Sequence, residues 1–161
     1  MNVTALLRPI DWEQAAEVLS PALLALFERM PRTDQLHSLR VMQRLREAGH
    51  THPDLLTAAL LHDVGKTRHP FRLPGRIFVV LVRTLLPERY TVWSQSEPAG
   101  WQRPLAVSAQ HPAWSAELMA AAGASALAVG LARRHADPPV QIAQTEADRL
   151  LIALQHADDA S

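Results

Sequence analysis

The spacing of apolar residues along the chain predicts an all-α protein. Apolar side chains recur three and four residues apart, as on one face of an α-helix, and no stretch alternates every second residue as a half-buried strand would. Capping residues, prolines and glycines divide this pattern into a bundle of seven to nine helices. The expected helices span residues 11–19, 20–30, 33–47, 54–64, 76–86, 104–110, 112–122, 124–135 and 145–157, and the last could also begin at 140.

The segment 54–64 is expected to form the central helix of the fold. It is apolar on nearly every side, which predicts that it is buried all round. We expect Gly65 to end this helix, as glycine commonly does. Further along the chain, Pro112 is expected to interrupt a helix at His111, because proline disfavours helical geometry in the residue before it.

Residues 66–103 differ from the rest of the chain. They contain seven Lys or Arg against two Glu, and five of the eight aromatic residues. Four prolines break this stretch. We interpret residues 67–103 as a basic, aromatic-rich insertion or lid within a single domain of residues 1–161.

The helix expected within this insertion has several possible roles. Arg76 and Arg83 lie seven residues apart on one face of an otherwise apolar segment. Such a helix can pack on the core, lie on a membrane surface or contact a second copy of the chain. A peripheral membrane or homodimer contact through residues 71–93 is therefore open at this point.

Overall composition excludes several classes of site. The chain has no cysteine, which excludes disulfides, thiolate metal sites and cysteine nucleophiles. Its 16 basic and 16 acidic residues cancel, so no specific nucleic-acid binding is expected. Residues 1–8 lack the basic start and apolar run of a secretory signal, and we expect a cytoplasmic protein.

Several histidines and aspartates fall on apolar helix faces, where such residues are costly without a partner. His37 lies on the apolar stripe of its helix, and His62 and Asp63 end the central apolar helix. Asp158 continues the apolar stripe of the last helix, whereas Asp159 follows its polar side. Imidazoles and carboxylates that converge from separate helices are typical ligands of a divalent metal ion.

Residues 58–66, Ala-Ala-Leu-Leu-His-Asp-Val-Gly-Lys, resemble the HD superfamily of metal-dependent phosphohydrolases, in which a helix ends in His-Asp-x-Gly-Lys. The resemblance covers roughly residues 30–160 and implies an HD-type helical bundle. It also implies that four residues bind a metal ion: His37, His62, Asp63 and Asp158.

Two further histidines stand where some branches of this superfamily build a second metal site. They are His111 and His135, and Asp63 would then bridge two ions. Without that role, His111 could be the N-cap of the helix that begins at Pro112. His135 could be a basic residue at a helix C-terminus, where it interacts favourably with the helix dipole. The implied cofactor is one or two divalent ions, with Mg, Mn, Fe, Ni and Zn all compatible with these ligands.

The resemblance implies hydrolysis of a phosphoester or phosphoanhydride in a small molecule, with a nucleotide favoured as substrate, by metal-activated water. Asp63 and Lys66 would be catalytic, and Lys66 and Arg40 would contact the substrate phosphate. No Gly-Tyr-Pro motif is present, which disfavours the branch that hydrolyses cyclic di-GMP. No carboxylate closely follows the His-Asp pair, which disfavours the deoxynucleotide monophosphatase branch. The alternative is a non-catalytic HD module that binds metal or nucleotide as a sensor.

Overall fold

The computed structural model describes residues 9–70 and 73–161, and within these ranges every regular element is a helix, as predicted. Residues 1–8, where the sequence predicts no secretory signal, lie outside the described residues, as do 71–72 of the proposed membrane or homodimer contact. The elements in chain order are α1 (Trp12–Val18), α2 (Pro21–Glu28), α3 (Arg32–Glu47), α4 (Pro53–Leu61), the short 3-10 helix η2 (Val64–Arg68), α5 (Leu73–Leu85), α6 (Pro87–Trp93), the 3-10 turn η3 (Gly100–Gln102), α7 (Arg103–Ala121), α8 (Ala126–Arg134) and α9 (Glu146–Asp159).

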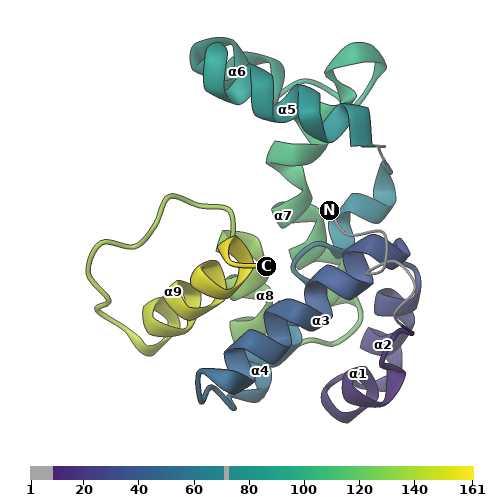
Figure 1. Ribbon diagram of the computed structural model, residues 1–161, viewed down its shortest axis with the longest axis vertical. Coiled ribbons are helices and arrows are strands. Elements are labelled where there is room, and N and C mark those ends of the chain that lie inside the picture. The colour runs from purple at the N-terminus through teal and green to yellow at the C-terminus, as the bar shows by residue number, and fades with distance from the viewer. Residues whose placement is uncertain (1–8, 71–72) are drawn as a thin grey trace.

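Helix α4 lies at the centre of the main body of the protein. All of residues 55–61 are buried, and α4 packs against α1, α2, α3, α8 and α9. This follows from its sequence, because a helix that is apolar on all sides gains most when it is surrounded by other helices. The His-Asp pair at the end of α4 is thereby buried, with His62 1% and Asp63 5% exposed. Figure 1 shows α4 beside α3 and α8.

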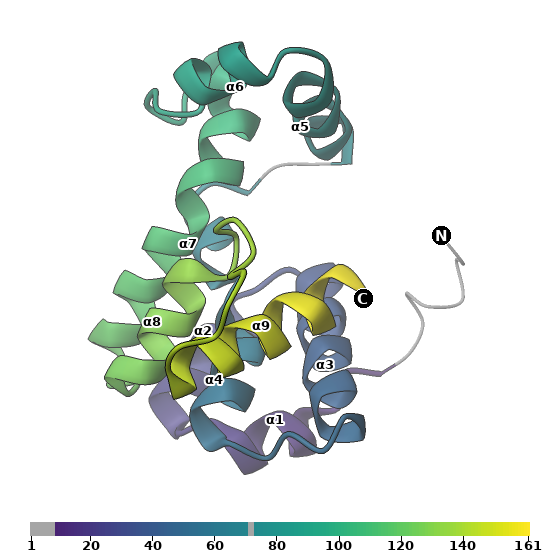
Figure 2. The ribbon, with the colours of Figure 1, turned by 90° about the vertical axis from the view of Figure 1, so that its left-hand side faces the viewer.

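The long helix α7 connects the main body to a second, smaller group of helices. Its N-terminal half extends away from the body and carries α5, α6 and η3, which we call the upper lobe (residues 73–102; Figures 1 and 2). This lobe has its own small apolar cluster, formed by Val79 and Val82 of α5 and Leu105 of α7. It contains most of the segment that the sequence sets apart as an insertion, although residues 67 and 68 belong to η2.

Helix α7 corrects the prediction of a break at His111. The helix runs through Pro112 without interruption. A proline inside a helix leaves the carbonyl four residues earlier without its usual N–H donor, and here that carbonyl belongs to Ser108. The Nδ1 of His111 lies 2.9 Å from Ser108 O and 3.0 Å from Val107 O, so the imidazole donates the hydrogen bond that proline cannot.

The end of α4 also differs from the prediction. The α-helix stops at Leu61, with His62 as its C-cap, and the chain continues as η2 from Val64 to Arg68. Gly65 therefore does not terminate a helix, and it is needed for close packing. A Cβ atom at Gly65 would lie 2.3 Å from His111 O and 2.6 Å from Ser115 N of α7.

Pro87, one of the four prolines expected to break the segment 66–103, begins a helix instead. Pro87 occupies the first turn of α6, a helix that the sequence pattern did not predict. Among the described helices, none is both long enough and apolar enough to cross a lipid bilayer.

Candidate metal centre

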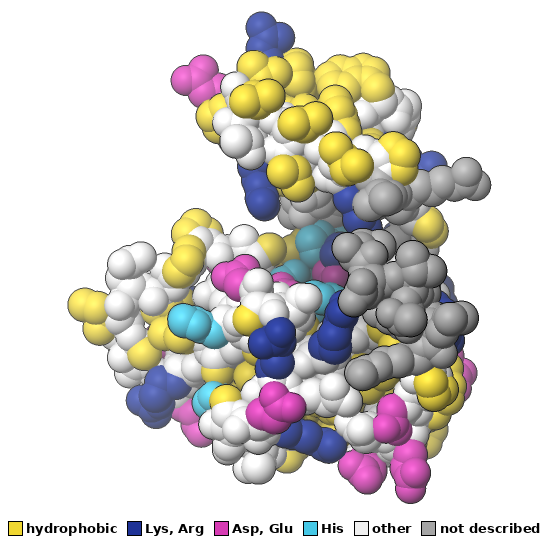
Figure 3. All heavy atoms as spheres, in the orientation of Figure 1, with side chains coloured by type: hydrophobic (Ala, Val, Ile, Leu, Met, Phe, Trp, Pro, Cys, Tyr) yellow, Lys and Arg dark blue, Asp and Glu magenta, His cyan; other side chains and the backbone are white. Residues whose placement is uncertain are grey.

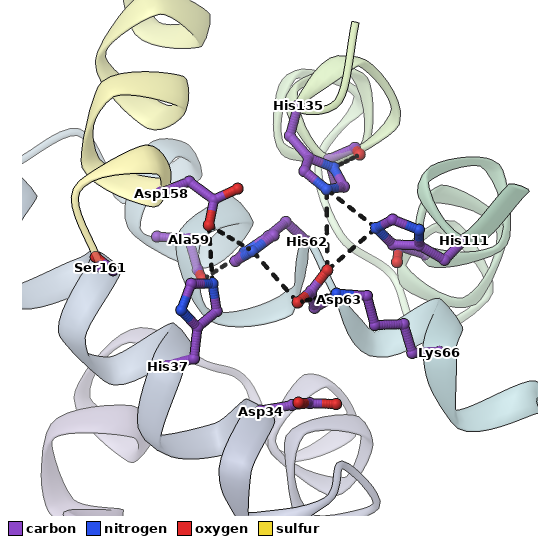
Figure 4. Close-up of polar contacts among 12 residues, drawn as sticks. Asp34, His37, Ala59, His62, Asp63, Lys66, His111, His135, Asp158 and Ser161 are labelled. Atoms are coloured by element: carbon purple, nitrogen blue, oxygen red, sulfur yellow. Dashed lines mark hydrogen bonds and ion pairs between the residues drawn. The ribbon is translucent and has the colours of Figure 1, made fainter. Parts of the chain in front are cut away.

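The fold brings together six residues that the sequence singled out, from separate elements around the end of α4 (Figure 4). Three groups of their ligand atoms each lie within 4.8 Å of one another. The residues are His37 of α3, His62 at the end of α4, Asp63 before η2, His111 of α7, His135 at the end of α8 and Asp158 of α9.

Three of the four histidines are oriented by their own helices. The Nδ1 of His62 lies 2.9 Å from Ala59 O, and the Nδ1 of His135 lies 2.7 Å from Ala132 O. Those carbonyls belong to the last turns of α4 and α8, where the backbone lacks intrahelical donors. A carbonyl only accepts, so each Nδ1 carries the proton, and His111 is held in the same way. The three Nε2 atoms are therefore left to face the site, as in metal-binding histidines.

Asp63 lies between two sets of histidines. Its Oδ1 is 3.1 Å from Nε2 of His111 and 3.9 Å from Nε2 of His135, while its Oδ2 is 3.8 Å from Nε2 of His62. Lys66 Nζ donates to the same Oδ2 at 2.6 Å. Burial raises the pKa of Asp63, but Lys66 and His62 outweigh burial and hold it well below its ordinary value. The Asp63 carboxylate is thus charged and buried, with Oδ1 toward His111 and His135 and Oδ2 toward His62.

The Nε2 atoms of His111 and His135 are placed where they could share a cation. Their Nε2 atoms are only 3.2 Å apart, and both rings already carry their proton on Nδ1. Burial, together with the nearby His62 and His111, lowers the pKa of His135 to about 3, so this ring is neutral at pH 7. Two Nε2 lone pairs and an Asp63 oxygen therefore converge on one point, which is repulsive unless a proton or a metal ion lies between them.

The other side of the site contains His37, His62 and Asp158. His37 Nε2 lies 2.8 Å from Asp158 Oδ1, and His62 Nε2 lies 3.6 Å from the same oxygen. Burial raises the pKa of Asp158, but His37 and His62 outweigh it and leave the pKa below its ordinary value. The Nε2 of His62 is buried and lacks a hydrogen-bond partner within the described part of the chain. A buried polar atom of this kind is expected to be satisfied by something the protein binds.

These distances fit divalent metal ions. Ligand bonds of about 2.1 Å to nitrogen or oxygen, at tetrahedral angles, place neighbouring ligand atoms about 3.4 Å apart. The separations between neighbouring ligand atoms in the site range from 2.8 to 3.9 Å, on both sides of that value. Two groups share Asp63: one adds His37 and His62, and the other adds His111 and His135. The site can therefore hold one or two ions, with Asp63 between them.

Comparison with protein families identifies the fold. The model of the family described as HD domain matches residues 36–160, which include all six residues of the candidate centre. The chain belongs to the HD domain family. This confirms the resemblance drawn from the His-Asp-x-Gly-Lys segment. No curated protein and no solved structure matches the chain.

The residues of the centre of this HD domain differ in their exposure to solvent. His62 and Asp63 are almost fully buried, whereas the side chains of His37 and Asp158 are 24% and 26% exposed. Asp158 faces His37, while its neighbour Asp159 is exposed and hydrogen-bonds to none of the six residues. The centre is therefore partly exposed at His37 and Asp158, and also at Lys66, whose side chain is 21% exposed.

The two residues expected to contact phosphate lie differently. Lys66 is next to the centre, but its Nζ is paired with Asp63. Arg40 is exposed on α3, and among the described residues it forms no hydrogen bond or ion pair. Lys66 is thus a part of the site in this structure, whereas Arg40 is only on the same helix as His37.

The sequence analysis missed Asp34, a buried carboxylate one turn before His37. Its Oδ1 accepts a hydrogen bond of 2.5 Å from Arg76 of α5, which fastens the upper lobe to α3 beside the centre. The spacing of Asp34 and His37 places both on one face of α3 and could have drawn attention to Asp34. Its partner could not be found, because Arg76 is 42 residues away in the chain.

We expect Gly65→Ala to destabilise the protein by about 1–3 kcal/mol, because the new methyl group would overlap the backbone of α7. Gly130→Ala is the matched control. Gly130 lies in α8 with no atom within 4 Å of an added Cβ, so alanine there should stabilise by about 0.5–1 kcal/mol. Urea unfolding of both variants measures the difference. Equal stability of the two would contradict the close packing of η2 on α7.

Proposed function

We propose that this HD domain is a metal-dependent phosphohydrolase that cleaves a phosphoester or phosphoanhydride bond of a nucleotide. The observation that carries the proposal is the position of Asp63, whose two oxygens face two separate sets of histidines. Membership of the HD domain family supports the same chemistry. The nucleotide is proposed from the resemblance to that superfamily and from the basic residues beside the site.

In this proposal His37, His62, Asp63 and Asp158, the four residues that the family resemblance implies, would hold one ion, and Asp63, His111 and His135 would hold a second. Such ions supply Lewis-acid chemistry, since they make water more acidic and offset the negative charge of phosphoryl oxygens.

The residues of the chain would position this chemistry. The backbone carbonyls of the last turns of α4 and α8 keep the Nε2 atoms of His62 and His135 directed inward. Lys66 fixes the Asp63 carboxylate through Oδ2 and presents a compact positive charge at the edge of the centre. We propose that Lys66, and secondarily Arg40, contacts the substrate phosphate.

The activity is tested by incubating the metal-loaded protein with phosphomonoesters, phosphodiesters and nucleoside mono-, di- and triphosphates, and measuring released phosphate or nucleoside. Turnover of a nucleotide that disappears in His62→Ala, with the fold retained by circular dichroism, is the expected result. A protein that retains metal but leaves all these compounds unchanged would instead favour a sensor that binds metal or nucleotide.

Metal content tests the number of ions. We expect about two ions per chain by mass spectrometry of protein purified without chelator, and about one in His111→Ala, which removes a ligand from one group only. His156→Ala is the control, because this exposed histidine is outside the cluster and should leave the content unchanged. A value near one ion in the unmodified protein, unaffected by His111→Ala, would contradict the second site.

A further inference from the structure

The upper lobe is attached to the half of α7 that precedes His111. The apolar cluster of the lobe includes Leu105 of this half. The segment after α6 is held by Gln110, whose Nε2 donates to Ser94 O at 2.9 Å and to Ser96 O at 3.0 Å. The lobe is therefore fastened to α7 as far as the residue directly before His111.

The half of α7 that follows His111 belongs to the main body. Ser115 Oγ accepts the backbone N–H of Gly65 at 2.8 Å, and Met119 is part of the main hydrophobic core. Figures 1 and 2 show α8 beside this end of the helix and the upper lobe at the other end. The boundary between the two parts of the protein therefore falls at His111 and Pro112.

The backbone of α7 lacks a helical hydrogen bond at this boundary. Pro112 has no N–H to donate to Ser108 O, and its ring crowds the same carbonyl. Prolines inside helices are common points of bending. The two halves of α7 are therefore joined by fewer backbone hydrogen bonds here than a regular helix would have, and this joint can act as a hinge.

The imidazole of His111 spans the joint. On one side its Nδ1 donates to Val107 O and Ser108 O, at 3.0 and 2.9 Å, in the half that carries the lobe. On the other side its Nε2 lies 3.1 Å from Asp63 Oδ1 and 3.2 Å from His135 Nε2, both in the main body. A cation shared by these three atoms would bind the ring to the body, whereas without a cation or proton between them the atoms repel.

The upper lobe also contacts the main body through Arg76 of α5, which donates to Oδ1 of Asp34. Asp34 is only 4% exposed, so its charge is costly to bury without this partner. Figure 3 shows a hollow between the upper lobe and the main body, in which His and Asp or Glu side chains are visible. The orientation of the lobe about the joint thus determines whether Arg76 reaches Asp34 and how wide this hollow is.

We propose that the ion held by Asp63, His111 and His135 also fixes the orientation of the upper lobe. Filling this site holds the lobe in the orientation described here, and emptying it frees the lobe to turn about Pro112. The ion favours the first state because only there do all three ligands reach it. The inference rests on the second ion of the proposed function, and it holds for any phosphate compound that the protein hydrolyses.

The distance between two spin labels tests this inference. The chain has no cysteine, so the variant Ala25→Cys/Val92→Cys places one nitroxide on α2 of the main body and one on α6 of the lobe, both at exposed positions. Double electron–electron resonance measures the distance distribution in EDTA and after loading with Zn²⁺, which is diamagnetic. We expect a single narrow distribution with zinc, and one about twofold broader in EDTA, because the freed lobe samples several orientations.

Two further substitutions in the labelled protein separate the joint from the ion. Pro112→Ala supplies the missing N–H for Ser108 O, so the distribution should be narrow with and without zinc, while the metal content remains unchanged. His111→Ala removes the bridging ring, so the distribution should stay broad even with zinc. Asp158→Asn is the matched control, because it alters a ligand on the other side of the centre, and zinc should still narrow the distribution.

Three results would overturn the inference. The first is the same distribution in EDTA and in zinc, in protein whose metal content shows both sites filled. The second is a zinc effect of full size in Pro112→Ala or His111→Ala, because the lobe would then move about another joint. The third is a zinc content of about one ion that is unaffected by His111→Ala, which would remove the second site of the proposed function as well. Zinc content measured on the labelled samples distinguishes this last case from the first.

Discussion

Asp63→Asn is expected to reduce the metal content of the protein from about two ions per chain to one or none, and to lower kcat by at least about a hundredfold. Asparagine has the same size but no charge, and only one of its two terminal atoms accepts a hydrogen bond. Both Asp63 oxygens face histidines, so the substitution removes an oxygen ligand from one set and the negative charge from both. Metal analysis and phosphate release on the same sample measure the two effects.

Asp159→Asn is the control for this prediction. Asp159 is the same residue type at the end of α9, next to Asp158, but it is exposed and hydrogen-bonds to none of the six residues. It should therefore retain both metal content and activity, whereas Asp158→Asn, which alters the partner of His37, should lose one ion. Full metal content in Asp63→Asn would contradict the bridging position of Asp63. Loss of metal in Asp159→Asn would instead assign the last ligand to Asp159.

Removal of metal with a chelator is expected to lower the melting temperature of the protein by about 10 °C. Without a cation, Asp63 Oδ1 and the Nε2 atoms of His111 and His135 remain buried at 3.1–3.9 Å, with repulsion between their lone pairs. A ligand present at a thousand times its Kd stabilises the folded state by about 4 kcal/mol. For a chain of this size, 1 kcal/mol corresponds to about 2–4 °C.

Differential scanning calorimetry with EDTA, and after adding back Mn²⁺, measures this shift. His156→Ala should show the full decrease, because the replaced histidine is outside the centre. Asp63→Asn should show a smaller decrease with chelator than the unmodified protein, because it binds fewer ions. An unmodified protein whose melting temperature is unaffected by EDTA would mean that the six residues hold no metal ion in the folded state.

The sequence was most informative where local pattern and chemistry coincide. The segment 55–61 predicts its own burial, since no face of this helix is polar, and so the position of His62 and Asp63 inside the fold follows directly. The family could be identified from the same short segment. His37 and Asp158 could be singled out because a polar residue on an apolar stripe must face the core.

The expectations that proline or glycine ends a helix were wrong where a side chain or a distant part of the backbone supplies a compensating contact. Proline in the middle of α7 predicts a break, but the ring of His111 donates to the carbonyl of Ser108 that proline leaves without a donor. Glycine after α4 predicts a helix end, but Gly65 instead allows η2 to approach α7, where Ser115 Oγ accepts its N–H at 2.8 Å. Ser115 is 50 residues away, and no local pattern contains that contact.

The sequence by itself determined the all-α architecture, the central helix, the family and the types of residue that could bind metal, because helical periodicity and the His-Asp-x-Gly-Lys segment are local properties. Only the tertiary structure decided that Asp63 lies between two sets of histidines, that Arg76 of α5 is fastened to Asp34 of α3, and that one apolar side of α5 remains uncovered. These features depend on how α3, α5, α7, α8 and α9 pack against one another. That packing is set by the sum of many weak contacts between residues far apart in the chain.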